Sequence, residues 1–185
     1  MPELPEVETV IRGISSSILG QTIDKCVLSL KKLRYPITRN FKKNILSTKV
    51  ISISRRAKYI LINLSNNKTI IIHLGMSGRI ILTSNNENPK FKHTHMSLYF
   101  KNNLIAKFID PRRFGCILLF DTKAISKDRL FSHLGLEPLS KQFNPNYLER
   151  SCQNKKASIK SVIMNQYIVV GIGNIYASES LFRSG

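Results

Sequence analysis

The sequence predicts an α+β protein, in which an N-terminal helix precedes an antiparallel β-sandwich or barrel and a smaller helical part follows. Three observations point to this fold class. Apolar residues recur at every third or fourth position at the start of the chain, form short blocks through its middle, and return to helical spacing after about residue 125. With 185 residues, the chain suits one large domain or two small ones.

The first helix is predicted over residues 3–19. The apolar positions of this stretch share one face of a helix, and they are Leu4, Val7, Ile11, Ile14 and Ile18. Gly20 follows the last of them and is a suitable stop. The opening sequence MPELPEVETV combines prolines with glutamates, and both residue types favour the start of a helix.

From residue 22 the period of the apolar pattern shifts towards two, which predicts strands. Turn-like sequences such as SNNK at 65–68 and KNN at 101–103 separate these segments, and residues 84–94 are predicted as a loop. Eight short strands joined by tight turns favour an antiparallel sandwich or barrel. The predicted strands are 22–30, 49–55, 59–65, 68–74, 78–83, 96–101, 104–109 and 116–121.

Helical patterns return in the last third of the chain. Residues 128–139, 144–153 and 158–166 are predicted as helices, and a glycine-rich turn then leads into a final helix. Asn144 fits a helix cap and Pro145 the first helical position. We place a domain boundary near residue 133, which gives domains 1–133 and 134–185. Short helices make a poor core by themselves, so we expect the second domain to be weakly stabilised.

The charge of the chain points to a polyanionic partner. Lys and Arg number 29 against 11 Asp and Glu, which gives a net charge of +18. Charge of this size attracts polyanions and steers their approach, so nucleic acid is the leading partner. A general bias of the composition towards lysine is the alternative explanation.

The cysteines and the apolar segments indicate a cytoplasmic protein. Cys26, Cys116 and Cys152 are widely spaced and form no CxxC pair, so we expect reduced, buried thiols and no metal site. The N-terminus lacks the pattern of a signal peptide. The apolar segments are too short to cross a membrane, and we expect no membrane contact.

The pair Pro2 and Glu3 carries two interpretations. If Met1 is removed, Pro2 exposes a secondary amine that is partly neutral at neutral pH. Such an amine can attack an aldehyde-like carbon and form an iminium ion, which is a strong electron sink, and Glu3 is a candidate proton carrier beside it. The alternative is that both residues only start a helix, which the local sequence alone favours.

Four later motifs support the chemical interpretation. RRAKY places Lys58 at the edge of a strand, and the two glycines of HLGMSGR predict a tight turn that exposes Met76. DPRRFG is a compact loop whose Arg112 and Phe114 could enter a DNA base stack. GIGNIYASES is a glycine-rich turn before a helix, where backbone N–H groups can bind phosphate.

PELPEVET, RRAKY, HLGMSG, DPRRFG and GIGNIYASE occur in this order, and together they closely resemble the formamidopyrimidine-DNA glycosylases. The resemblance extends from Pro2 to the last residue. It implies a two-layer β-sandwich with an N-terminal helix, followed by a helix–two-turn–helix domain. It also implies a bifunctional enzyme of base-excision DNA repair that removes oxidised purines, 8-oxoguanine and formamidopyrimidines, and then cuts the abasic site by β,δ-elimination.

The resemblance also implies roles for individual residues. Pro2 matches the nucleophile that forms the Schiff base, and Glu3 matches the carboxylate that protonates the sugar. Lys58 matches a lysine that contacts the phosphate flanking the lesion, and we group it with the catalytic residues. The matched DNA-binding residues are His73, Asn174 and Lys160 at the phosphates and near the lesion, and Met76, Arg112 and Phe114 in the gap left by the flipped nucleotide.

The chain also departs from the pattern of the family it resembles. The family continues with further helices, a loop that closes over the damaged base and a four-cysteine zinc finger, and none of these is present. We therefore expect a partial helix–two-turn–helix domain, no zinc or other cofactor in this chain, and uncovered apolar side chains at Ile175, Leu181 and Phe182.

Three functional hypotheses follow from the sequence. The first is a glycosylase and lyase, impaired by truncation, that acts as a monomer on double-stranded DNA containing an oxidised purine or an abasic site, in the cytoplasm of a bacterium and associated with the nucleoid. The second is an inactive DNA-binding remnant. The third is an endonuclease VIII-like glycosylase for oxidised pyrimidines.

Overall fold

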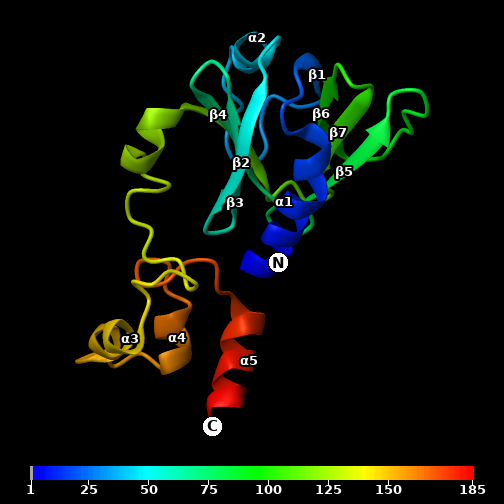
Figure 1. The fold of residues 1–185 in the computed structure, drawn as a ribbon. Helices are drawn as coiled ribbons and strands as arrows, with labels where there is room; N and C mark the ends of the chain where they lie inside the picture. Colours follow the sequence, from blue (N-terminus) through cyan, green and yellow to red (C-terminus); the bar gives the residue numbers. More distant parts are fainter. Residues whose placement is uncertain (1) are drawn as a thin grey trace.

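The computed structural model describes residues 2–185, and within them it places an N-terminal helix, two four-stranded sheets and a separate group of short helices (Figure 1). Helix α1 (Leu4–Ile18) buries the face that its apolar spacing predicts. It contacts β2, β3 and β5, which orients its N-terminal end towards the helical part of the molecule.

The strands form an antiparallel sandwich, which confirms the predicted fold class and excludes a closed barrel. One sheet has the order β1 (Ile23–Leu28), β6 (Thr94–Phe100), β7 (Leu104–Ile109) and β5 (Arg79–Ser84). The other has the order β2 (Val50–Arg56), β3 (Tyr59–Leu64), β4 (Lys68–His73) and β8 (Cys116–Asp121). Each of the eight predicted strands is found.

Strand β4 has apolar side chains buried on both faces of the second sheet. Ile70 and Ile72 lie in the main core between the sheets, whereas Ile71 packs on the outer face with Phe131. A strand covered on both faces has a continuous apolar sequence, as in the run TIII of β4. The segment after β8 therefore covers the outer face of the second sheet. It begins with a 3-10 helix, η1 (Thr122–Lys127), which the sequence patterns did not predict.

The helical part contains α3 (Pro145–Cys152), α4 (Ile159–Ile163) and α5 (Asn174–Ser184). All three were predicted, and the Asn144 side chain accepts a hydrogen bond from the Tyr147 N–H, as expected of a cap. A short helix α2 (Phe41–Ile45) precedes β2 and was not predicted. The domain boundary near residue 133 stays a prediction.

The prediction of a helix over residues 128–139 is wrong, because this segment consists of turns and irregular backbone with one isolated bridge from Leu136 to Val169. Local hydrogen bonds, such as the one from the Ser132 N–H to the Asp128 carbonyl, close turns in its first half, whereas distant partners hold its second half. The Arg56 guanidinium donates to the carbonyls of Leu134 and Gly135, and the Gly135 N–H donates to the Gln166 carbonyl. A Cβ atom at Gly135 would lie 2.3 Å from the Ile168 carbonyl oxygen, so only glycine fits this close approach.

The cysteines follow the prediction in part. Cys26 and Cys116 are buried free thiols, whereas Cys152 is only partly buried at the end of α3. Within residues 2–185, no helix has both the length and the apolar character needed to cross a membrane.

Candidate functional site

The carboxylate of Glu3 lies at the junction between α1 and α5. Glu3 directly precedes α1, and its side chain is only 3% exposed. Its two oxygens accept hydrogen bonds from the backbone N–H groups of Gly173 at 2.6 Å, Ile175 at 2.9 Å and Tyr176 at 3.3 Å. The positive end of the α5 dipole thus faces this buried carboxylate, and the three N–H groups fix the position of its oxygens.

Two glycines of the GIGN turn allow this close approach. A Cβ atom at Gly173 would lie 2.5 Å from Cδ of Glu3, and one at Gly171 would lie 2.7 Å from Cδ1 of Leu4. Gly171 also has a φ of +82°, a conformation that glycine adopts without strain. Its carbonyl accepts a hydrogen bond from the Leu4 N–H at 3.0 Å. The turn therefore holds the N-terminal residues in place.

Glu6 ties the backbone of Glu3 to α5. Its Oε2 accepts from the Glu3 N–H at 2.8 Å, and its Oε1 accepts from the Tyr176 hydroxyl at 3.0 Å. Burial alone would raise the pKa of Glu6, but these hydrogen bonds outweigh it and lower the pKa below its ordinary value. Pro2 precedes this fixed backbone and is partly buried. The predicted removal of Met1 concerns the one residue outside the described range.

Lys58 lies in the turn between β2 and β3 and is 4% exposed. Burial lowers the pKa of its ammonium group, and the negative charges of Glu3 and Glu6 oppose this shift. The structure thus brings Glu3 and Lys58 within electrostatic reach of each other, with Pro2 next to Glu3 in the chain. The arrangement combines a fixed carboxylate, a lysine and a candidate amine. Such groups can transfer protons, and the amine can attack an electrophilic carbon.

His73 ends β4 as a neutral hydrogen-bond donor. Burial, together with the charges of Arg34 and Lys58, lowers its pKa to about 4. Its Nδ1 accepts from the Gly75 N–H at 2.9 Å, so the neutral ring carries its proton on Nε2. The ring packs edge-on against Tyr59, with 4.9 Å between the ring centroids. A neutral imidazole in this position can donate to an anion without adding a charge.

The turn after β4 and the loop before β8 lie against each other, and each has a large apolar side chain at the surface. Met76 is 43% exposed and Phe114 is 48% exposed, so both apolar side chains are accessible to a partner. The Arg112 guanidinium lies 4.8 Å from the centroid of the Phe114 ring. Both loops are thus arranged with apolar and basic groups at the surface, as their sequences predicted.

Asp110 organises these loops, a role that the sequence patterns did not reveal. It is fully buried, and its Oδ1 accepts from the Ser77 hydroxyl at 2.7 Å while its Oδ2 accepts from the Gly115 N–H at 2.8 Å. A Cβ atom at Gly75 would lie 2.5 Å from the backbone nitrogen of Gly115, so the loops touch through their backbones. The aspartate of DPRRFG was the available signal, but an aspartate before proline is common in ordinary turns.

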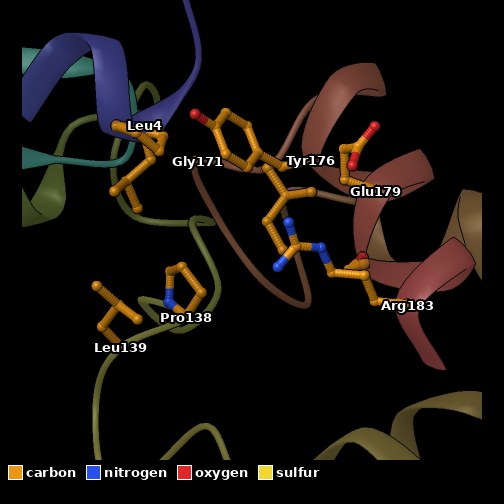
Figure 2. Close-up of a pocket in the computed structure, with 10 residues that line it drawn as sticks. Leu4, Pro138, Leu139, Gly171, Tyr176, Glu179 and Arg183 are labelled. Atoms are coloured by element: carbon orange, nitrogen blue, oxygen red, sulfur yellow. The ribbon is translucent and has the colours of Figure 1, made fainter.

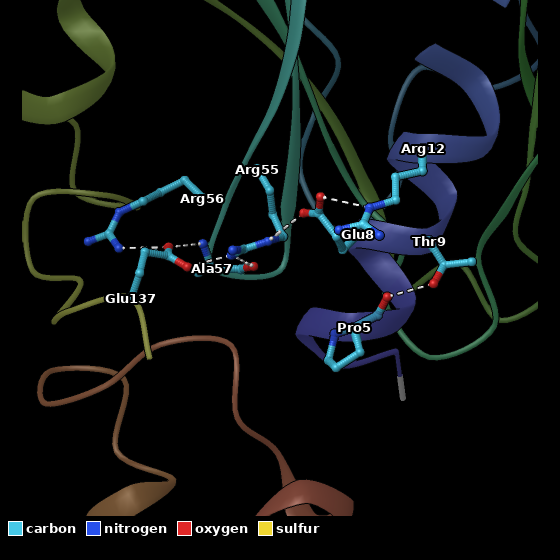
Figure 3. A network of polar contacts seen from close by, with 8 residues as sticks. All are labelled: Pro5, Glu8, Thr9, Arg12, Arg55, Arg56, Ala57 and Glu137. Carbon is cyan, nitrogen blue, oxygen red and sulfur yellow. Dashed lines mark hydrogen bonds and ion pairs between the residues drawn. The ribbon is translucent and has the colours of Figure 1, made fainter. Parts of the chain in front are cut away.

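A second missed residue, Glu137, connects the sandwich to the segment that leads into the helical part (Figure 3). Its carboxylate pairs with Arg55 and Arg56 and accepts from the Ala57 N–H at 2.8 Å. Arg55 also pairs with Glu8 of α1 at 3.2 Å. Burial alone would raise the pKa of Glu137, but the hydrogen bonds from Ala57, Arg55 and Arg56 lower it. The network fixes the turn that carries Lys58.

The remaining predicted residues lie on or against α5. Asn174 is exposed in its first turn, next to the N–H groups that bind Glu3. The Lys160 ammonium donates to the Ser178 hydroxyl at 2.9 Å. Lys160 thus contacts α5, the helix whose first turn binds Glu3. Within residues 2–185 it makes no ion pair.

An apolar pocket of about 470 Å³ opens between the start of α1, the 138–139 turn and α5 (Figure 2). Leu4, Pro138, Leu139, Gly171 and Tyr176 are among its lining residues. Of the side chains on α5 that we expected to be uncovered, Ile175 is exposed and Phe182 is 86% exposed. Leu181 is partly buried, so the expectation is wrong for this residue.

The described residues do not fit the zinc site of the family that the sequence resembles. Cys26 lies in β1, Cys116 begins β8 and Cys152 ends α3. Within residues 2–185, no group of three or more His, Cys, Asp or Glu side chains is arranged to hold a metal ion.

The fold and the site define a class of α+β protein. In this class an N-terminal helix packs on a β-sandwich, and the residues that precede this helix contact the first turn of a later helix. Comparisons with known proteins identify the family. The Formamidopyrimidine-DNA glycosylase N-terminal domain matches residues 1–117, and the Formamidopyrimidine-DNA glycosylase H2TH domain matches residues 134–185. The chain belongs to the formamidopyrimidine-DNA glycosylase family.

Individual relatives agree with this assignment. The chain is 46% identical to a formamidopyrimidine-DNA glycosylase of Rickettsia bellii, over 98% of this chain and 66% of the relative. It is 47% identical to one of Legionella pneumophila, over 98% of this chain and 65% of the relative. A solved complex of the Lactococcus lactis enzyme with DNA containing an abasic site is similar with a TM-score of 0.88 and 30% identity, over 97% of this chain and 65% of that one. The chain thus spans just under two thirds of the length of these relatives.

Proposed function

We propose that this protein excises oxidised purines from double-stranded DNA and cleaves the resulting abasic site. The observation that carries this proposal is the environment of Glu3, a buried carboxylate fixed by three backbone N–H groups next to Pro2 and near Lys58. Membership of the formamidopyrimidine-DNA glycosylase family supports the choice of substrate. We include in the proposal that the protein acts as a monomer in the bacterial cytoplasm.

The proposed reaction begins at the amine of Pro2 after removal of Met1. The nitrogen lone pair attacks C1′ of the damaged nucleotide, and the bond from C1′ to the base breaks with its electron pair going to the base. Glu3 takes the proton that the attacking nitrogen releases and passes it to the sugar oxygen, while water protonates the departing base. The C1′–O bond then breaks, the ring opens, and the C1′–N bond becomes an iminium ion. The iminium withdraws electrons from C2′, and loss of a proton there expels the 3′ phosphate. A second elimination then releases the 5′ phosphate.

The other predicted residues take binding roles in the proposal. Lys58, His73 and Asn174 contact phosphates around the extruded nucleotide, and Lys160 supports this contact surface from α4. Met76, Arg112 and Phe114 fill the space in the base stack. The exposure of Met76 and Phe114 and the contact of Arg112 with the Phe114 ring support this assignment.

The test is covalent trapping with borohydride, which reduces the iminium to a stable amine. We expect an adduct with duplexes that contain 8-oxoguanine or an abasic site, and strand cleavage when borohydride is omitted. A chain with one extra serine between Met1 and Pro2 moves the amine and is the matched control. DNA binding without any adduct from either duplex would overturn the proposal and favour a DNA-binding remnant.

A second candidate substrate is an oxidised pyrimidine. The Lactococcus lactis enzyme has been solved in a complex with DNA that contains an oxidised pyrimidine, at a TM-score of 0.88 to this chain. Duplexes with oxidised purines and oxidised pyrimidines, compared under the same conditions, separate the two. We expect faster excision of the purine, and the reverse order would favour an endonuclease VIII-like activity.

A further inference from the structure

A cavity of about 290 Å³ lies beside Lys58, at the end of the second sheet. Its lining includes five nitrogen-bearing side chains and no carboxylate, and the five are Arg34, Lys58, His73, His133 and Gln166. The sequence motifs pointed to Lys58 and His73 only. A cavity lined by hydrogen-bond donors and positive charge suits an anion.

The backbone around Arg34 is fixed by its neighbours. The Arg34 N–H donates to the Gly115 carbonyl at 3.1 Å, and Leu33 before it is buried in the main core. Lys32 and Pro36 pair across the turn that contains Arg34. This short loop therefore presents Arg34 from a defined position, next to the loop that carries Arg112 and Phe114.

The side chain of Arg34 is exposed and is available to a ligand. Its guanidinium lies 5.5 Å from the centroid of the Tyr35 ring, which also lines the cavity. Among residues 2–185, no ion pair includes Arg34. Arg55 and Arg56, in contrast, are both occupied by Glu137.

The charge of Arg34 already reaches His73. Burial lowers the pKa of His73 most. Of the two positive charges that lower it further, Arg34 has a larger effect than Lys58. Arg34 and Lys58 thus supply positive charge, while the neutral His73 ring supplies a donor. These groups can satisfy several oxygen atoms of one phosphate.

We propose that Arg34 is a further phosphate-binding residue, which joins Lys58 and His73 in holding one DNA phosphate in this cavity. The inference deepens the proposed function and rests on it. The planar guanidinium can donate two parallel hydrogen bonds to two phosphate oxygens, a fixed geometry that the ammonium group of lysine lacks. The Arg34 N–H donates to the Gly115 carbonyl. The same hydrogen bond would therefore position both the phosphate-binding Arg34 and the loop that carries Arg112 and Phe114.

The first test measures the affinity for a duplex with a stable abasic-site analogue at several salt concentrations. We expect Arg34→Ala to weaken binding about tenfold and to reduce the slope of log affinity against log salt by about 0.9, the value for one lost phosphate contact. Arg34→Lys keeps the charge and should preserve most of the slope. Arg39→Ala is the matched control, because Arg39 lines a different hollow, with Lys31 and Lys42, and does not line the cavity beside Lys58.

The second test identifies the phosphate. Single uncharged methylphosphonate linkages are placed at each position around the abasic analogue, and binding is compared between the wild-type protein and Arg34→Ala. We expect one linkage that weakens wild-type binding about tenfold and has no further effect on the variant. The Arg34 N–H bond to Gly115 involves the backbone only, so the fold should survive the substitution.

The outcomes separate this inference from the function on which it rests. If the wild-type protein is trapped by borohydride but Arg34→Ala binds like Arg39→Ala, the role of Arg34 is overturned and the proposed function stands. Additive effects at every linkage would also overturn it. If the wild-type protein neither binds nor is trapped, both proposals fail.

Discussion

The carboxylate of Glu3 accepts a hydrogen bond from the backbone N–H of Gly173 at 2.6 Å, across 170 positions of the sequence. The residue proposed as proton carrier therefore also caps α5. As a consequence, the geometry around Pro2 depends on the glycine-rich turn of the helical part, and damage to that turn should act directly on the chemistry.

Gly173→Ala tests this dependence. The new Cβ atom would lie 2.5 Å from Cδ of Glu3, and the carboxylate would have to move away from the α5 N–H groups. We expect borohydride trapping to fall at least about 100-fold, which corresponds to losing a positioned acid. The measurement is the initial rate of adduct formation on abasic DNA.

Gly13→Ala is the control for this substitution. Gly13 lies within α1, and a Cβ atom there meets no other atom within 4 Å. We expect unchanged trapping and a gain in stability of about 0.5–1 kcal/mol, because alanine favours the helix. Equal trapping by the two glycine variants would show that the contact between Glu3 and α5 does not control the reaction.

Glu137→Gln should loosen the helical part without unfolding the sandwich. The substitution removes the charge that pairs with Arg55 and Arg56, and hydrogen bonds to charged groups of this kind contribute about 1.5–3 kcal/mol. We expect faster amide hydrogen exchange in α3, α4 and α5, and unchanged protection in β4. Glu149→Gln, on α3 outside this network, should leave exchange in both parts as it is. Uniform loss of protection throughout the chain would contradict this account.

The stability of the protein should depend on pH through His73. Its pKa in the folded state is about 4, below the ordinary value of 6.5. Between these values the unfolded chain binds more protons than the folded one, so stability increases as the pH rises from about 4 to about 6.5 and is lost as the pH falls. The contribution of this group is at most about 3 kcal/mol.

The measurement for His73 is the free energy of unfolding in urea at about pH 4.5 and about pH 7. His73→Gln should reduce the difference between the two values, while His93→Asn, at an exposed position with a φ of +62° that asparagine tolerates, should not. The same pH dependence in all three proteins would show that His73 is not the group responsible.

Local sequence patterns were sufficient for most of the fold. The eight strands and α1 follow from the period of their apolar residues, because each element buries one face or, in β4, both faces. Residues 128–139 also have helical spacing, but Arg56 and Gln166 bind their backbone from distant parts of the chain. Such tertiary hydrogen bonds leave no periodic signal, so the sequence predicted the wrong local structure.

The site was predicted unevenly for a related reason. Motifs with glycine or exposed aromatic residues stand out locally, and they led to Met76, Phe114 and the turn before α5. Asp110 binds Ser77, and the backbone of Arg34 binds Gly115, so both are positioned by partners far away in the sequence. Only the folded chain brings these groups together.

The most direct test of the central claim is to locate the covalent bond. After trapping on abasic DNA and digestion of both polymers, mass spectrometry identifies the peptide that carries the reduced sugar. We predict that the sugar is attached to the nitrogen of Pro2, in a peptide that lacks Met1, and that Glu3→Gln lowers its yield. A sugar attached to Lys58 or to another lysine, with Pro2 unmodified, would contradict the account.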